Sequence, residues 1–278
     1  MSLSYVSRRL YFSAMHVYRN PSWSDEENRR WFGLCSNPSG HGHDYVLDVT
    51  VKGHIDPATG MVVNISEIDR SVGQLVEETL DGKWLDREHP YFQARIPTTE
   101  NLVRYLWECL DGMWTECELH RVRVREYDRL FSEKERGSMI RLTRKYHFSA
   151  AHRLHAVTLS DEENRNIFGK CNNPNGHGHN YYLEVSVAGE PDPVTGMIIP
   201  LPELDAVVDR LVIQRFDHKH LNLDTEEFRE LNPTAEHIVK VIWDLLKPEI
   251  PGLCKIGLYE TEKNYFEYMG EPVAGVES

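Results

Sequence analysis

The sequence predicts an α+β protein built from two tandem domains, each an antiparallel β-sheet with two helices on one face. A duplication is the first observation: residues 160–181 match residues 24–45 at 16 of 22 positions, at a constant offset of 136 residues. The second observation is that hydrophobic periodicity gives the same strand-strand-helix-helix-strand-strand order in both halves. This order cannot form parallel crossovers throughout, so it favours an antiparallel sheet.

The duplication also predicts where the chain divides. We expect one domain in residues 1–137 and a second in residues 138–278, with the charged, glycine-containing segment 128–139 as the linker. One layer of helices leaves sheet edges uncovered, and proteins normally pair or cover such edges. Several domains are therefore expected to join edge to edge into closed β-barrels.

Composition limits the class of protein. The chain has 278 residues, 40% of them hydrophobic, and a net charge of -13. This charge repels polyanions, so we expect no nucleic-acid partner, and no apolar run approaches the ~18 residues of a membrane span. Five cysteines, an odd number without framework spacing, favour a reducing compartment and hence the cytoplasm.

The elements of the first repeat follow from the period of its apolar residues. In order, we expect a strand from Arg8 that ends at His16, a polar turn-rich stretch at 20–33, a strand at 45–53, a return strand at 61–65, helices at 66–80 and from Thr98 or Thr99, and a strand at 119–127. The second repeat is expected to follow the same order.

Three histidines of each repeat suggest a metal site. His177 and His179 are two residues apart, so in an extended segment both rings leave the same face. His152 ends the strand that opens the repeat, and the first repeat has the same three positions in His16, His41 and His43. Three neutral imidazoles leave the fourth position of a tetrahedral zinc open, which is the catalytic pattern.

Cys171 lies six residues before His177 and has two possible roles. As a fourth ligand it would close the metal site, whereas as a thiolate beside a cation it could act as a general base. The adjacent Asp217 and His218 favour the second role, because an imidazole oriented by a carboxylate can activate a thiol.

Several motifs together resemble the 6-pyruvoyl-tetrahydropterin synthase family, over essentially the whole second repeat. They are FSAAHRLH, FGKCNNPNGHGHNY, DPVTGM, FDHKHLN, PTAEH and LYETEKN. The resemblance implies zinc held by His152, His177 and His179, Cys171 as base, and Asp217 and His218 as the relay. It also implies Glu260 as the pterin anchor and Thr234 and Glu236 beside the pterin, although Ala235 replaces a threonine of the family.

The resemblance further implies a fold, a reaction and an assembly. The domains would be tunnelling-fold (T-fold) domains. The zinc enzyme would convert 7,8-dihydroneopterin triphosphate to 6-pyruvoyl-tetrahydropterin with loss of triphosphate. For the triphosphate, Arg153 and Lys170 are the candidate ligands. The expected homo-oligomer is a trimer of tandem chains that imitates a hexamer.

The first repeat departs from the family pattern at one catalytic position. It retains the three histidines, Cys35, and the pterin-segment residues Thr98, Thr99, Glu100 and Glu126. However, FDHKHLN has become LDGKWLD, so Asp81 survives and Gly82 replaces the relay histidine. Since glycine cannot transfer a proton, the first repeat is expected to bind zinc, with a pterin as a further candidate ligand, but to turn over poorly or not at all. It would then serve mainly to complete the assembly.

Three alternatives remain open at this point. One is 6-carboxy-tetrahydropterin synthase, a relative that acts on the same substrate in deazapurine (queuosine) biosynthesis, although its cysteine typically lies closer to HGH. Another is an aldolase-like variant with glutamate in place of the cysteine, which Cys171 disfavours. The third is a non-catalytic scaffold that binds zinc or a pterin, with both cysteines as metal ligands.

Overall fold

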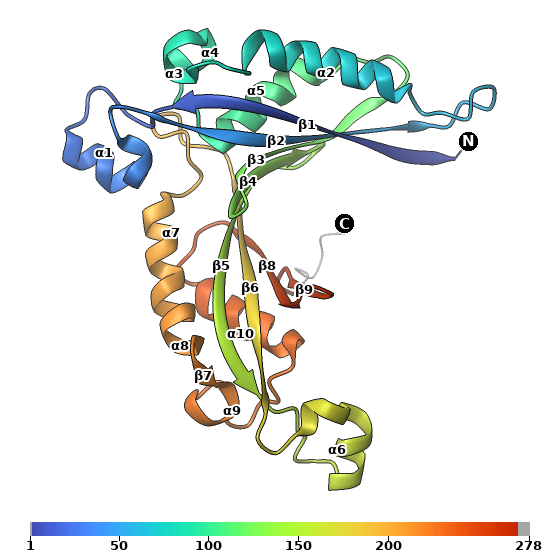
Figure 1. The fold of residues 1–278 in the computed structure, drawn as a ribbon, viewed down its shortest axis with the longest axis vertical. Coiled ribbons are helices and arrows are strands. Elements are labelled where there is room, and N and C mark those ends of the chain that lie inside the picture. The colour runs from blue at the N-terminus through green and yellow to red at the C-terminus, as the bar shows by residue number, and fades with distance from the viewer. Residues whose placement is uncertain (1, 272–278) are drawn as a thin grey trace. The chain divides into compact units, whose positions relative to one another are not determined.

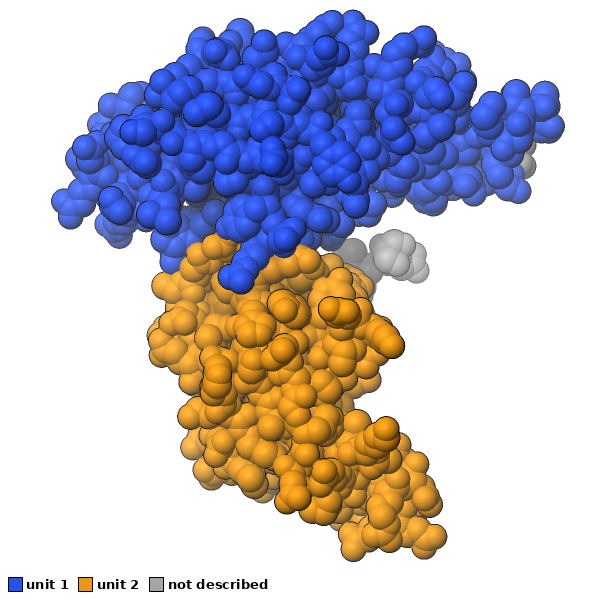
Figure 2. Space-filling view, in the orientation of Figure 1, with its two compact units in different colours: residues 1–143, 188–202 blue, residues 144–187, 203–278 orange. Residues whose placement is uncertain are grey.

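The computed structural model describes residues 2–271, which form two compact units. The first unit consists of residues 1–143 and 188–202, and the second of residues 144–187 and 203–278 (Figure 2). Residues 272–278, which the expected second domain includes, lie outside the described part. Residues 188–202 belong to the second repeat by sequence but pack with the first unit.

The first unit contains an antiparallel sheet in the order β1-β2-β3-β4. Its strands are β1 (Leu3–His16), β2 (His41–His54), β3 (Glu118–Tyr127) and β4 (Leu130–Glu135). Helices α2 (Ile65–Thr79) and α5 (Thr99–Leu110) cover one face, and their apolar sides bury the inward residues of the strands (Figure 1). The short helices α3 (Leu85–Glu88) and α4 (Pro90–Gln93) connect them.

The second unit repeats this plan with the sheet order β5-β6-β8-β9. The strands are β5 (Ile140–His152), β6 (His177–Gly189), β8 (Leu253–Thr261) and β9 (Asn264–Tyr268), and the two-residue β7 (Lys219–His220) pairs in parallel with β5. The first four residues of β5 and the last two of β6 belong to the first unit. The helices are α7 (Leu201–Val208), continued by a π-turn at Asp209–Ile213 and α8 (Gln214–Phe216), then α9 (Leu221–Asp224) and α10 (Ala235–Leu246). The predicted α+β class with antiparallel sheets is confirmed.

Two expectations for local structure are wrong. Residues 61–65 form no return strand, because Asn64 caps α2, which begins at Ile65, while Val62 and Val63 are buried beneath it. The polar stretch at 20–33 contains a helix, α1 (Asp25–Phe32), and α6 (Asp161–Phe168) is its counterpart. Both begin with a capping box, Ser24 with Glu27 and Ser160 with Glu163, which stabilises a helix that has little apolar surface.

The expected linker at 128–139 is also wrong, because residues 130–135 form β4. The acidic Glu133 is buried and accepts hydrogen bonds from Arg123 on β3 and Arg141 on β5. Charge pairing thus allows a strand whose second half, Glu133–Glu135, is charged to be paired in the sheet, which hydrophobic alternation alone did not predict. Among the described helices, none is long and apolar enough to cross a membrane.

Candidate metal centre

The histidines of the second unit converge because of where their strands begin and end. His152 is the last residue of β5, while His177 and His179 are the first and third residues of β6 and share one face. One potential ligand atom from each of the three lies within 4.8 Å of the others. The Nε2 atoms of His152 and His177 are 3.2 Å apart, and nitrogens bound to one tetrahedral zinc are separated by about 3.3 Å.

Electrostatics and hydrogen bonds make these residues suitable for a metal. Burial lowers the pKa of His152 to about 4 and also lowers the pKa of His177, so both rings are neutral at pH 7. The carbonyl of Pro233 can only accept, so His152 Nδ1 donates to it at 2.7 Å and leaves Nε2 with a lone pair. His179 Nε2 is buried without a hydrogen-bond partner among the described residues. A metal ion would satisfy it.

Glu260, on β8, lies against this cluster. One carboxylate oxygen is 3.8 Å from His152 Nε2 and 3.9 Å from His179 Nε2, and the side chain is 16% exposed. The structure therefore brings the predicted pterin anchor next to the predicted zinc ligands, which lie more than 80 residues earlier in the chain.

Cys171 lies in a 3₁₀ turn (Gly169–Asn172) that follows α6. Burial raises the pKa of its thiol, and the negative charge of Glu260 raises it further. The protein alone therefore keeps this thiol protonated at neutral pH, and a thiolate requires a cation nearby.

Asp217 and His218 follow α8 and form the expected pair, with Asp217 Oδ2 2.8 Å from His218 Nδ1. The main chain fixes both residues: Ser149 N donates to Asp217 Oδ1, and His218 N donates to Ser149 O. The hydrogen bond from Ser149 is the main reason why the pKa of Asp217 is lowered. His218 is 83% exposed and, with His179, lines a cavity of about 470 Å³.

The remaining predicted residues lie at the edge of the site. Thr234 caps α10 by accepting a hydrogen bond from His237 N, and Glu236 is exposed. Arg153 and Lys170 line a second cavity of about 780 Å³ together with Arg165 and His177. Sequence reasoning missed Arg165, which lies on α6 and therefore on an element that was not predicted.

The first unit contains a related cluster at the ends of β1 and β2. His16 pairs with His41 in the sheet register, and their Nε2 atoms are 3.1 Å apart. Here, however, Tyr45 Oη bonds His16 Nδ1 at 2.9 Å, in place of the carbonyl that His152 uses. Asp81 accepts from Ser13 N as Asp217 does from Ser149 N, and Gly82 N donates to Ser13 O.

Tyr18 is a residue of this cluster that sequence reasoning missed. It is 1% exposed, and its hydroxyl donates to Glu126 Oε2 at 2.8 Å. A comparison of the two repeats could have identified Tyr18. The corresponding position of the second repeat is Leu154, whose side chain cannot donate a hydrogen bond.

Comparison with known proteins gives a consistent result. A family model described as 6-pyruvoyl tetrahydropterin synthase matches the chain twice, at residues 5–136 and 141–271. The 6-pyruvoyl tetrahydrobiopterin synthase of Homo sapiens is 45% identical over 138 residues, which cover 49% of this chain and 95% of that protein. The 6-carboxy-5,6,7,8-tetrahydropterin synthase of Haemophilus influenzae is 26% identical over 151 residues, covering 47% and 99%.

A solved structure is also similar to part of the chain. The Caenorhabditis elegans 6-pyruvoyl tetrahydropterin synthase is 42% identical and covers 48% of this chain and 96% of its own, with a TM-score of 0.46. Each of these relatives thus corresponds to about half of the present chain. With two family-model matches that together span nearly all of it, the chain belongs to the 6-pyruvoyl tetrahydropterin synthase family and carries two copies of its T-fold domain.

Proposed function

We propose that the second repeat is a zinc-dependent lyase that converts 7,8-dihydroneopterin triphosphate to 6-pyruvoyl-tetrahydropterin with loss of triphosphate. The observation that carries this proposal is the convergence of His152, His177 and His179 beside Glu260, all in one unit. In the same proposal, residues 1–137 form a degenerate domain and residues 138–278 the catalytic one.

The reaction is balanced within the substrate. Elimination of triphosphate, which leaves with the electrons of its C–O bond, converts one hydroxyl-bearing carbon of the side chain to a ketone. The second hydroxyl-bearing carbon is oxidised while the C6–N5 bond of the ring takes up its two hydrogens, so no outside oxidant is required. Bound zinc would supply Lewis-acid stabilisation of the oxygen charge that develops during proton removal.

The side chains of the second repeat would carry out proton transfer and bind the pterin and the triphosphate. We assign Cys171 as the base that removes the carbon-bound proton, and His218, oriented by Asp217, as the acid or proton shuttle. Glu260 can accept the paired N–H donors of the amino-pyrimidine edge of the pterin, close to the metal ligands. The cavity lined by Arg153, Arg165 and Lys170 suits the triphosphate, because it places cations beside His177.

A comparison of two copies of one turn supports the proposed assembly. In the first unit Thr98 Oγ1 donates to Gly196 O at 2.6 Å, and Glu100 Oε1 accepts from Ile198 N. A side chain at Gly196 would meet Asn101 at 2.6 Å, so only glycine fits. The turn at 195–197 is thus buried on the segment that begins at Thr98.

Within the described part of the chain, the equivalents of this turn and of its partner segment, residues 59–61 and Thr234–Glu236, make no such contact with each other. Residues 59–61, the same Thr-Gly-Met sequence, are exposed, and so is Glu236, which corresponds to Glu100. We propose that the 59–61 turn of one chain binds the Thr234–Glu236 segment of a second copy. Repeated head to tail, this contact closes a ring, for which a trimer of tandem chains is the simplest form. The cytoplasm, a reducing compartment, suits five cysteines that form no disulfide.

Identification of the product tests the function. The zinc-loaded chain is incubated with 7,8-dihydroneopterin triphosphate, and the products are identified by mass spectrometry. We expect 6-pyruvoyl-tetrahydropterin and triphosphate, with activity lost in Cys171→Ala. Cys35→Ala is expected to retain at least ~100-fold more activity than Cys171→Ala. The reason is that only Cys171 is assigned as the base, and general base catalysis contributes about 10²–10⁴-fold to the rate. Equal losses would contradict the assignment of the second repeat as the catalytic one.

The same assay separates the alternatives. A 6-carboxy product with acetaldehyde would replace the proposal by 6-carboxy-tetrahydropterin synthase activity, which the match to the Haemophilus influenzae protein keeps as the second candidate. Unchanged substrate would indicate a scaffold that binds metal or pterin.

A further inference from the structure

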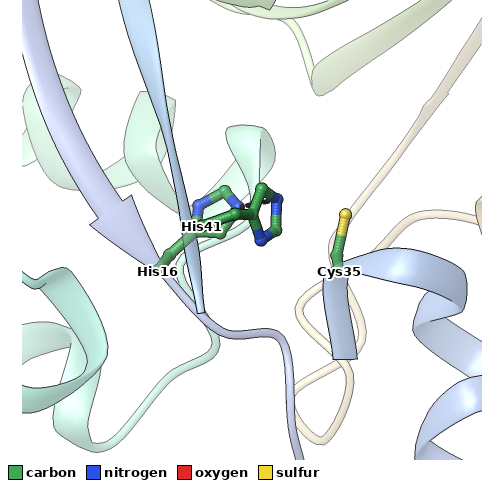
Figure 3. Close-up of side chains that lie close together, drawn as sticks. All are labelled: His16, Cys35 and His41. Atoms are coloured by element: carbon green, nitrogen blue, oxygen red, sulfur yellow. Dashed lines mark hydrogen bonds between the residues drawn. The ribbon is translucent and has the colours of Figure 1, made fainter. Parts of the chain in front are cut away.

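The first repeat brings its cysteine into the metal cluster, whereas the second repeat does not. The ligand atoms of His16, Cys35 and His41 all lie within 4.8 Å of one another (Figure 3). Cys171 occupies the equivalent sequence position, yet in the described part of the chain it belongs to no such group of metal-binding side chains. The two sites therefore differ in their donor atoms as well as in their relay residue.

His43 lies beside this cluster, in a second group with His16 and Glu126 whose ligand atoms also lie within 4.8 Å of one another. Its ring lies 4.9 Å from that of His41 and 5.2 Å from that of His16, measured between centroids. Its Nε2 is buried and has no hydrogen-bond partner among the described residues, although Glu126 Oε1 lies 3.5 Å away. With His43 as the fourth donor, three imidazoles and one thiolate would complete a tetrahedral zinc site and leave no position for substrate.

In the first repeat, a hydrogen bond within the protein occupies Glu126, the carboxylate that would anchor a pterin. Tyr18 donates to Glu126, which is 2% exposed, whereas Glu260 has no such donor at Leu154. The Glu126 carboxylate is therefore already engaged within the protein. A ligand would have to displace the buried Tyr18 hydroxyl to reach it.

Aromatic residues shield this arrangement. Tyr18 packs with Phe32 and Met197 in a small apolar cluster, against which Cys35 is partly buried. Trp23 and Trp31 belong to the same cluster, while their counterparts Leu159 and Ile167 are smaller, and Ile167 is 62% exposed. An apolar surround favours a metal-bound thiolate over a solvated one and keeps water away from the site.

We propose that the first repeat holds a closed, structural metal site in which the Cys35 thiolate joins His16, His41 and His43. On binding, the S–H bond of Cys35 breaks, its proton passes to solvent, and a sulfur–metal bond forms. The site then stabilises the first unit and takes no substrate. This inference concerns the first repeat alone and stands whichever product the second repeat makes.

Cobalt(II) substitution of the full chain tests the proposal, because cobalt bound to a thiolate gives a near-ultraviolet charge-transfer band that histidine ligands do not give. We expect two cobalt ions per chain and a band that disappears in Cys35→Ser but remains in Cys171→Ser. Cys109→Ser, in the same unit but outside the cluster, is the matched control and should keep the band. Loss of the band in Cys171→Ser instead, or no band in the native sequence, would overturn the proposal.

A second measurement uses the native sequence and so does not depend on the folding of a variant. Alkylation of each cysteine is followed by peptide mass spectrometry with and without a chelator. Metal should slow the alkylation of Cys35 by more than about tenfold, because a coordinated thiolate is a poor nucleophile. Equal rates for Cys35 in the two states would refute the proposal, while lyase activity in the same sample reports separately on the second repeat.

Discussion

His218 is the only described residue other than glycine with a positive φ, at 58°, and Gly82 has φ 67° at the equivalent place. A left-handed conformation costs a non-glycine residue about 1–2 kcal/mol, and such strain is retained where the side chain has a function. The second repeat thus keeps a strained histidine that the first repeat has replaced. The catalytic role proposed for the His218 side chain therefore comes at the expense of stability, because its backbone is strained.

Exchange of these residues is therefore expected to separate activity from stability. His218→Gly should lower kcat by about 10²–10⁴-fold, because the proton shuttle is removed. It should also raise the free energy of unfolding by up to about 1 kcal/mol through relief of the backbone strain. The larger backbone entropy of glycine in the unfolded chain reduces this gain. Enzyme kinetics and urea denaturation measure the two effects.

The converse change supplies the control. Gly82→His should destabilise by about 1 kcal/mol, because no atom lies within 4 Å of an added Cβ and only the backbone is strained. Gly112→Ala, also at a positive φ in open space, should cost a similar amount. A His218→Gly variant that is both active and less stable would show that the strain has no catalytic purpose.

Glu100 predicts a pH effect on stability. It is 3% exposed, and burial raises its pKa from 4.5 to about 6, in spite of hydrogen bonds from the main chain and from threonine hydroxyls. Because the folded pKa is the higher one, its protonated form favours folding, and stability is lost as pH rises from about 4.5 through 6. A rise of the pKa from 4.5 to about 6 corresponds to about 2 kcal/mol.

Glu100→Gln removes this titration while Gln can still accept from Ile198 N. The variant should match the native sequence near pH 4.5 and exceed it by about 2 kcal/mol at pH 7.5 in urea denaturation. A stability difference that does not change with pH would contradict the assignment.

At the scale of the element, β4 depends on Glu133 and its two arginines. Burial alone would raise the pKa of Glu133, but Arg123 and Arg141 outweigh it and hold this pKa below its ordinary value. Glu133→Gln should destabilise by about 2 kcal/mol at pH 7, since it removes the charge that both guanidinium groups share.

The pH dependence of this loss has a fixed sign. A depressed carboxyl pKa contributes stability above the unfolded value of about 4.3, and the contribution disappears as pH falls through the folded pKa. The native sequence and Glu133→Gln should therefore converge in acid. Glu135→Gln, at a more exposed pair, should change stability by less than about 0.5 kcal/mol and serves as the control. If both variants behave alike, β4 does not depend on the buried charge.

At the scale of the whole molecule, assembly should depend on the 59–61 turn. Met61 is 44% exposed, whereas its counterpart Met197 is 4% exposed in the first unit. Met61→Asp should give a single-chain mass in place of the trimer by light scattering, because a charge would be buried in the contact. Met113→Asp, at a site 40% exposed, should leave the mass unchanged. A trimeric Met61→Asp variant would exclude this turn as the contact.

The fold was largely predictable because the same pattern of strands and helices occurs in both repeats of the sequence. Period-2 strands and the Thr98 cap of α5 depend on local sequence, and the structure confirms them, although β2 and β6 begin earlier than predicted, at His41 and His177. Helices α1 and α6 were missed because their stability comes from capping boxes, and β4 was missed because its charges are compensated by residues on neighbouring strands. Both failures arise where polar interactions replace hydrophobic periodicity.

The sequence by itself determined the duplication, the three histidines of each repeat and the loss of the relay histidine at Gly82, since these depend only on residue type and spacing. The tertiary structure decided how each site is closed. It brought Glu260 to the second cluster, placed Tyr18 on Glu126, and brought Cys35 to His16 and His41. The first two contacts join residues that are distant in the chain, and in all three only the packing of strands and turns sets the distances between the side chains.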